Sequence, residues 1–190
     1  TLKYILGVLV ASFAMGSCVD NDDVVVNYYA STKVTAAGFL DQNPERFSQF
    51  INILQRTPYY ALLSTYGEFT LFAPTNEAID KYVTEMGFGS IEGMTDANCD
   101  TLARTHIIKK GAYFTTDVVE GAMPDLNMED SYIVLSSDSD VYNNNELVYY
   151  INKNARMIEY DDSVTNGVVH TVNNVITRTS DFLPDRIEAD

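Results

Sequence analysis

Few residues in this chain could carry out covalent or metal chemistry. The 190-residue sequence holds two histidines, His106 and His170, and two cysteines, Cys18 and Cys99. The histidines lie far apart, and no His-x-x-x-His or Cys-x-x-Cys pair gives the spacing of zinc ligands. No Gly-x-Ser-x-Gly elbow of a serine hydrolase occurs either. We therefore expect no catalytic residue, no metal site and no cofactor, and a function that consists of binding.

Three weaker candidates for a site remain in the sequence. Residues 138–146 are rich in Asp, Asn and Ser, but they lack the glycine and the ligand spacing of an EF-hand loop, so a solvated turn is predicted. Cys99 falls in the apolar stripe of a predicted helix, where a buried and inert thiol is expected. The tyrosine pairs at 28–29, 59–60 and 149–150 could stack against sugars, although filling of the core and of strand edges is their more common role.

The charge of the chain limits its partners. Lys and Arg number 12 against 27 Asp and Glu, which gives a formal net charge of −15. Such a surface repels phosphate backbones and anionic headgroups. Nucleic acid is therefore excluded as an expected partner, and a neutral or basic partner is favoured.

The N-terminus has the pattern of an export signal. Residues 4–14 are mostly apolar and follow Lys3, which matches the hydrophobic region of a secretory signal and is too short to span a bilayer. The Gly-Ser that precedes Cys18 is similar to the lipobox of bacterial lipoproteins, in which the cysteine is acylated. We predict a signal peptide over residues 1–17, a lipid on Cys18 that anchors the chain to the membrane, and an acidic tether over residues 18–33.

The acidic cluster at residues 20–23 has two interpretations. It resembles the signal that sends some Gram-negative lipoproteins to the outer face of the outer membrane, and it would equally serve as a solvated spacer. The expected location is the outer membrane of a Gram-negative bacterium, at the cell surface.

The body of the chain has helical patterns first and strand patterns later. Asn43 and Pro44 give a cap and a first-turn proline, and apolar residues follow at helical spacing. Further helices are predicted after Thr57, Thr75 and Thr95, the last with His106 on its apolar face. Strand patterns cover residues 69–73, 132–135, 147–151, 157–160 and 168–176. This order favours an α+β domain over a doubly wound nucleotide-binding fold.

Two segments resemble the signature motifs of the fasciclin-like domain. Residues 67–79, Gly-Glu-Phe-Thr-Leu-Phe-Ala-Pro-Thr-Asn-Glu-Ala-Ile, are similar to the first motif, and residues 166–172, Asn-Gly-Val-Val-His-Thr-Val, are similar to the second. The central motif of the family resembles the segment at His106, where Thr105 replaces the usual aromatic residue. The resemblance covers residues 34–179 and leaves 180–190 as a tail or linker.

The resemblance implies a fold and a function. It implies a wedge-like β-sandwich of about seven strands with several helices packed at one end, and an adhesion or ligand-binding module with no general catalytic role. The threonine at position 105 argues against integrin-type binding through the central motif. The motif residues are expected to be mainly structural, as helix caps, tight turns and buried hydrogen-bonding groups: Thr70, Thr75, Asn76, His106, Gly167 and His170.

These observations favour a lipid-anchored cell-surface module for adhesion or ligand binding, with an extracellular protein or glycan as partner. The alternative is a cell-envelope enzyme or the substrate-capture subunit of a polysaccharide-utilisation system. A structural spacer is a third possibility.

Overall fold

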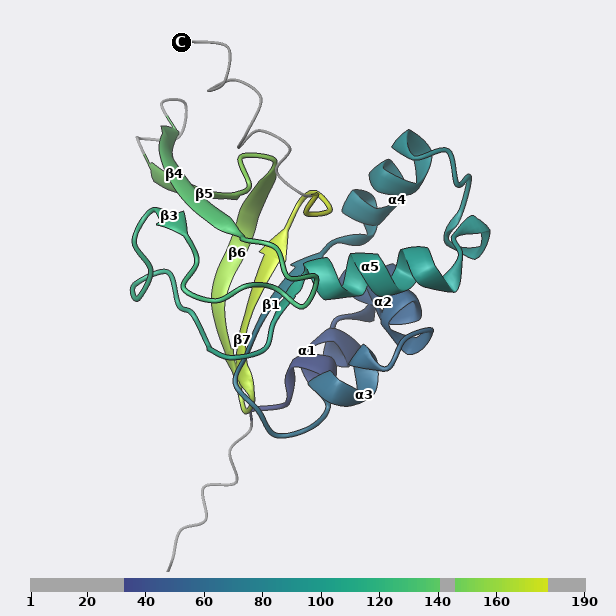
Figure 1. The fold of residues 1–190 in the computed structure, drawn as a ribbon, viewed down its shortest axis with the longest axis horizontal. Coiled ribbons are helices and arrows are strands. Elements are labelled where there is room, and N and C mark those ends of the chain that lie inside the picture. The colour runs from purple at the N-terminus through teal and green to yellow at the C-terminus, as the bar shows by residue number, and fades with distance from the viewer. Residues whose placement is uncertain (1–32, 141–145, 178–190) are drawn as a thin grey trace, which may run out of the picture. The chain divides into compact units, whose positions relative to one another are not determined.

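The computed structural model describes residues 33–140 and 146–177. Its helices come mostly before its strands in the sequence, as Figure 1 shows. The predicted signal peptide, Cys18, the acidic cluster and the tail at 180–190 lie outside the described residues.

The helices of the described chain begin where the sequence carries caps or prolines. Pro44 occupies the first turn of α2, and the hydroxyl groups of Thr75 and Thr95 accept hydrogen bonds from the first turns of α4 and α5. The helices are α1 (Ala36–Gln42), α2 (Pro44–Gln55), α3 (Tyr59–Leu63), α4 (Asn76–Glu85) and α5 (Asp96–Thr105), with a short 3-10 helix η1 (Ile91–Gly93).

The described strands form one curled, mixed sheet in the order β2-β1-β7-β6-β5-β4-β3. Only β1 and β7 pair in parallel, and the remaining pairs are antiparallel. The predicted α+β class and the predicted number of strands are confirmed. The strands are β1 (Phe69–Pro74), β2 (Ile107–Ile108), β3 (Gly121–Ala122), β4 (Val134–Asp140), β5 (Glu146–Ile151), β6 (Ala155–Val164) and β7 (Gly167–Val172).

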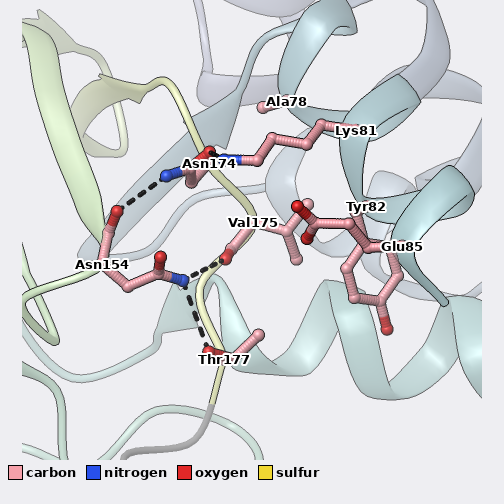
Figure 2. A pocket seen from close by; sticks show the side chains of 8 residues that line it. All are labelled: Ala78, Lys81, Tyr82, Glu85, Asn154, Asn174, Val175 and Thr177. Carbon is pink, nitrogen blue, oxygen red and sulfur yellow. Dashed lines mark hydrogen bonds between the residues drawn. The ribbon is translucent and has the colours of Figure 1, made fainter.

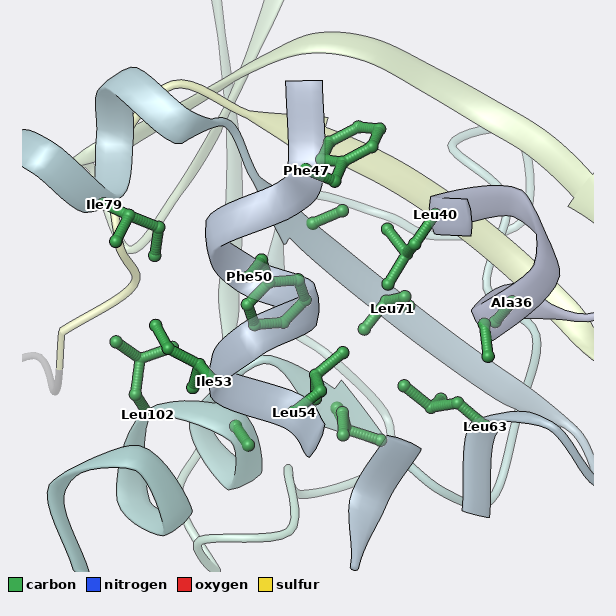
Figure 3. Packing of buried hydrophobic residues seen from close by; sticks show 14 of the residues in the cluster. Ala36, Leu40, Phe47, Phe50, Ile53, Leu54, Leu63, Leu71, Ile79 and Leu102 are labelled. Atoms are coloured by element: carbon green, nitrogen blue, oxygen red, sulfur yellow. The ribbon is translucent and has the colours of Figure 1, made fainter. Parts of the chain in front are cut away.

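One hydrophobic core lies between the helices and one face of β1 and β7. Phe47, Phe50 and Leu54 of α2 are fully buried there, and Leu71 of β1 belongs to the same cluster (Figure 3). Burying a large apolar side chain contributes about 2 kcal/mol. The apolar spacing of α2 thus fixes the helical layer against the sheet.

A second core lies on the opposite face of the same two strands. Phe72 of β1 and Val172 of β7 are fully buried in it together with Leu135 and Ile151 from the distant half of the sheet. Because side chains alternate along a strand, β1 and β7 supply residues to both cores. The curl of the sheet encloses this second core.

Helix α1 was not predicted, and it changes the role of Asn43. The side-chain amide of Asn43 donates to the carbonyl oxygen of Phe39 in α1 at 2.7 Å and makes no capping bond to α2. Asn43 is the N-cap residue of α2 by position, as predicted, but its side chain does not cap that helix. Asn43 alone separates the two helices, so its amide stabilises the end of the first one.

The polar segment at 138–140 is a strand, where a turn was expected. β4 pairs with β5 from Leu135 opposite Ile151 to Asp140 opposite Glu146. The polar residues at the end of β4 lack the apolar alternation that marks a half-buried strand. The sequence pattern therefore did not indicate how far β4 extends.

A substitution at Gly167 tests how closely the backbones of β1 and β7 approach each other. Its φ angle is +146°, and a Cβ atom added there would lie 1.9 Å from the carbonyl oxygen of Phe69. We expect Gly167→Ala to lower the free energy of unfolding by on the order of 4 kcal/mol or more, because backbone must move. Denaturant unfolding measures the loss.

Gly89→Ala is the matched control for this variant. Gly89 also has a positive φ, +75°, but nothing lies within 4 Å of an added Cβ atom. Gly89→Ala should lower the free energy of unfolding by about 1 kcal/mol. Equal stability losses in the two variants would contradict the close contact at Gly167.

Candidate functional site

Asn166 joins three separate parts of the described chain. Its side-chain oxygen accepts from the backbone N–H of Ala36 at 2.8 Å, and its amide donates to the carbonyl oxygens of Leu63 and Thr65 at 2.8 and 2.7 Å. Its own carbonyl oxygen accepts from the N–H of Phe69 at 2.9 Å. The side chain is buried, so its donors and acceptors are used within the fold.

Thr70 anchors the segment that follows β2. Its hydroxyl donates to the carbonyl oxygen of Gly111 at 2.7 Å and accepts from the N–H of Tyr113 at 2.9 Å. Thr70 is fully buried. The segment at Gly111 to Tyr113 is irregular, and the Thr70 hydroxyl gives its backbone the hydrogen bonds that a neighbouring strand would otherwise provide.

His170 holds the same segment from the next strand. Its Nε2–H donates to the carbonyl oxygen of Tyr113 at 2.9 Å, and its Nδ1 accepts from the N–H of Asp161 at 3.1 Å. The ring stacks on Phe72 with 5.4 Å between centroids. Burial lowers the pKa of His170. This neutral imidazole links β1, β6, β7 and the segment after β2.

His106 lies directly after α5 and connects it to the chain beyond β7. Its Nδ1–H donates to the carbonyl oxygen of Leu102 at 2.8 Å, and its Nε2 accepts from the N–H of Ile176 at 3.0 Å. Complete burial lowers its pKa from 6.5 to about 4. Both ring nitrogens are occupied, which leaves no free nitrogen for a ligand or for proton transfer.

Thr75 and Asn76 stand at the corner between β1 and α4. The Thr75 hydroxyl accepts from the N–H of Ala78 at 3.3 Å. The Asn76 amide donates to the carbonyl oxygen of Glu45, and its oxygen accepts from the N–H of Gln49, both at 3.0 Å. Those two groups lie one helical turn apart on α2. Asn76 therefore binds α4 to α2.

The remaining reactive residue is also buried. Cys99 is free and fully buried, and burial raises the pKa of its thiol. Across residues 33–140 and 146–177, no three His, Cys, Asp or Glu side chains gather in a group that could hold a metal ion. The geometry of these residues supports a role in holding the fold together.

A small pocket between α4 and the chain after β7 is lined by a polar network. Lys81 donates to the side-chain oxygen of Asn174 at 3.0 Å, and Asn174 donates to the carbonyl oxygen of Asn154 at 2.8 Å (Figure 2). The pocket volume is about 40 Å³. That space suits water and excludes a sugar ring.

Two larger grooves open on the surface of the described chain. One, of about 430 Å³, lies between the residues after β2 and the turn before β4, and Lys109, Lys110, Asp130 and Tyr132 are among its lining residues. The other, of about 450 Å³, lies by α4 and η1 and is lined by Asp80 and Glu92. Either is large enough for a small ligand.

Sequence reasoning did not single out Asn166 or either groove. Asn166 stands in the second motif, directly before a glycine with positive φ, so a buried turn amide was a readable signal. The first groove is formed by two separate segments, residues 109–110 and 124–132, and no local pattern indicates that they lie side by side. We name it the Lys109 groove.

The described geometry defines an α+β scaffold whose motif residues hold the fold together. The Fasciclin domain model matches residues 45–178. Human periostin is 32% identical over 124 residues, which cover 65% of this chain and 14% of periostin. The chain belongs to the fasciclin domain family.

A solved structure shares the fold. It is a FAS1 domain pair from the insect cell adhesion molecule fasciclin I, with a TM-score of 0.61 and 18% sequence identity, covering 76% of this chain and 51% of that one. Fasciclin domains are adhesion-type modules. Within the described residues, every helix is too short or too polar to cross a membrane.

The burial of His106 predicts an acid-sensitive fold. The imidazole is held neutral with a pKa of about 4 against an ordinary 6.5. As the pH falls from 6.5 to about 4, this histidine takes up a proton in the unfolded chain but stays neutral in the folded chain. The free energy of unfolding therefore decreases. The contribution of His106 should be on the order of 3 kcal/mol, present above pH 6.5 and lost towards pH 4.

Comparison with His106→Gln isolates this contribution from that of the carboxylates. The difference in unfolding free energy between wild type and variant should shrink as the pH falls from 6.5 to 4. NMR titration of the His106 ring gives an independent check in the wild-type protein. Parallel pH curves, or a ring that protonates near pH 6.5, would show that the imidazole is not held neutral.

Proposed function

We propose that this chain is a lipid-anchored cell-surface module for adhesion or ligand binding, with an extracellular protein or glycan as its partner and no catalytic step. One observation carries this proposal. The chain has the fasciclin fold, and its histidines and Cys99 are buried, with both histidines hydrogen-bonded within it. A ligand would therefore bind to exposed surface, which includes the two larger grooves.

Charge and anchoring support a particular mode of binding. The net charge of −15 favours neutral or basic partners and weakens association with dense polyanions. A lipid on Cys18 would place many copies on one membrane at the outer surface of a Gram-negative cell. Modest affinity at each site would then be raised by avidity.

The alternative function is that of a cell-envelope enzyme or substrate-capture subunit. The observation in its favour is that Asp125 and Asp130 both line the Lys109 groove, since paired carboxylates are the catalytic groups of most glycoside hydrolases. Asp125 is already engaged, because the hydroxyl of Tyr113 donates to its carboxylate. That engagement favours binding over hydrolysis.

A glycan and extracellular-matrix array tests the proposed function. The soluble protein from Asp20 onward should bind a defined subset of glycans or matrix proteins without converting them. A basic protein partner should dissociate as the salt concentration rises, since salt screens the field. Tight binding to heparin at physiological salt would contradict the electrostatic part of the proposal. Hydrolysis of a bound glycan that Asp130→Asn abolishes would contradict the absence of catalysis.

Lipidation of Cys18 is tested in cells that express the full chain. Metabolic labelling with a fatty-acid probe should mark the wild type and fail to mark Cys18→Ala. The Cys99→Ala variant is the control and should keep the label, because Cys99 is buried in the folded domain. A labelled Cys18→Ala variant would refute the anchor.

A further inference from the structure

The Lys109 groove has walls that are fixed before any ligand arrives. The buried Asn127 donates to the carbonyl oxygen of Thr105 at 3.1 Å, and its side-chain oxygen accepts from the N–H groups of Glu129 and Ser131 at 3.1 and 2.9 Å. Met128 donates through its backbone to Ile107 at 2.9 Å. A preformed groove loses little conformational entropy on binding.

The groove exposes apolar and aromatic side chains together. Tyr132 is 63% exposed and Leu126 is 40% exposed, and both line it. A tyrosine ring offers an apolar face and a hydroxyl at low conformational cost. Such a ring can cover the C–H face of a sugar.

The groove is lined by as many lysines as aspartates, in a chain with more than twice as many acidic as basic residues. Each arginine of the described chain has a carboxylate within 4 Å: Arg46–Glu159, Arg56–Asp96, Arg104–Glu129 and Arg156–Asp140. Lys109 and Lys110 are both exposed, and neither has an ion-pair partner among the described residues. A strongly acidic protein therefore keeps two adjacent ammonium groups available at this groove.

Two carboxylates in the same groove narrow the choice of ligand. Asp125 and Asp130 would repel a dense run of acidic residues in a peptide, and they accept hydrogen bonds from hydroxyl groups. A sugar with one carboxylate and several hydroxyls satisfies both the lysines and the aspartates. A run of acidic side chains supplies carboxylates to the lysines but no hydroxyl donors to the aspartates.

We propose that the Lys109 groove binds a glycan containing spaced uronic acid residues, with a carboxylate at Lys109 and Lys110 and a sugar face on Tyr132. This inference rests on the proposed function, because it names the partner of a domain that acts by binding. Spacing of the uronates matters, since the net charge of −15 repels a densely charged polymer.

The test compares a glucuronate-containing oligosaccharide with its carboxyl-reduced, uncharged counterpart on the soluble protein. Wild type should prefer the acidic form, and added salt should weaken only that form. Lys109→Gln/Lys110→Gln should bind the acidic form roughly three- to tenfold more weakly, as expected for two exposed charge contacts. Its affinity for the reduced form should not change.

Two further variants make the result specific. Lys153→Gln removes an exposed lysine from the β5–β6 turn that does not line the groove, and should bind both sugars like wild type. Tyr132→Ala should weaken both forms equally. Unfolding temperatures that match wild type would confirm that the exposed substitutions leave the fold intact.

Three outcomes would overturn the inference. Equal affinity of wild type for the acidic and reduced sugars is one. Unchanged binding by Lys109→Gln/Lys110→Gln is another, and lysine-dependent preference for a glutamate-rich peptide is the third. If wild type still binds other glycans or matrix proteins on the array, the proposed function stands without this inference, and if it binds none of them, both fail.

Discussion

The structure depends on the parallel pairing of β1 with β7, because this pair joins the two parts of the sheet and supplies residues to both cores. The two backbones approach so closely at Gly167 that a methyl group would collide with Phe69. Asn166, one residue earlier, ties the same junction to α1 and to the end of α3. A buried amide with all its groups satisfied costs little, whereas an unsatisfied one costs about 1 to 3 kcal/mol. The junction therefore tolerates few other residues.

The two histidines hold further segments of the chain against the β1–β7 pair and its two cores. His106 fastens α5 to the chain beyond β7, and His170 fastens the segment after β2 to the inner strands. Each imidazole donates with one nitrogen and accepts with the other, which only the neutral form can do. A residue that offers both functions on a flat, packable ring suits a site where irregular backbone meets a sheet. This accounts for histidines in the motifs without any catalytic task.

Much of the fold could be predicted from the sequence, because α2, α4, α5 and β1 carry caps, prolines and apolar periodicity of their own. Helix α1 is only 7 residues long, too short for its apolar residues to show a repeated helical spacing, and the polar half of β4 takes its strand form from pairing with β5. The buried position of His170 followed from alternation along its strand. The Lys109 groove could not be predicted, because its two walls meet only through long-range contacts such as that of Ile108 with Asn127.

The contacts at the two ends of β7 determine how the domain would carry mechanical load. At the start of β7, Val34 accepts from Thr165 and Lys33 donates to Ser163. Beyond its other end, the carbonyl oxygen of Thr177 accepts from Asn152. A pull between residues 33 and 177 thus enters and leaves near opposite ends of one strand. The force is then directed along β7 and shears its hydrogen bonds to β1 and β6 at the same time. The β1–β7 pair at the centre of the sheet would therefore resist the pull.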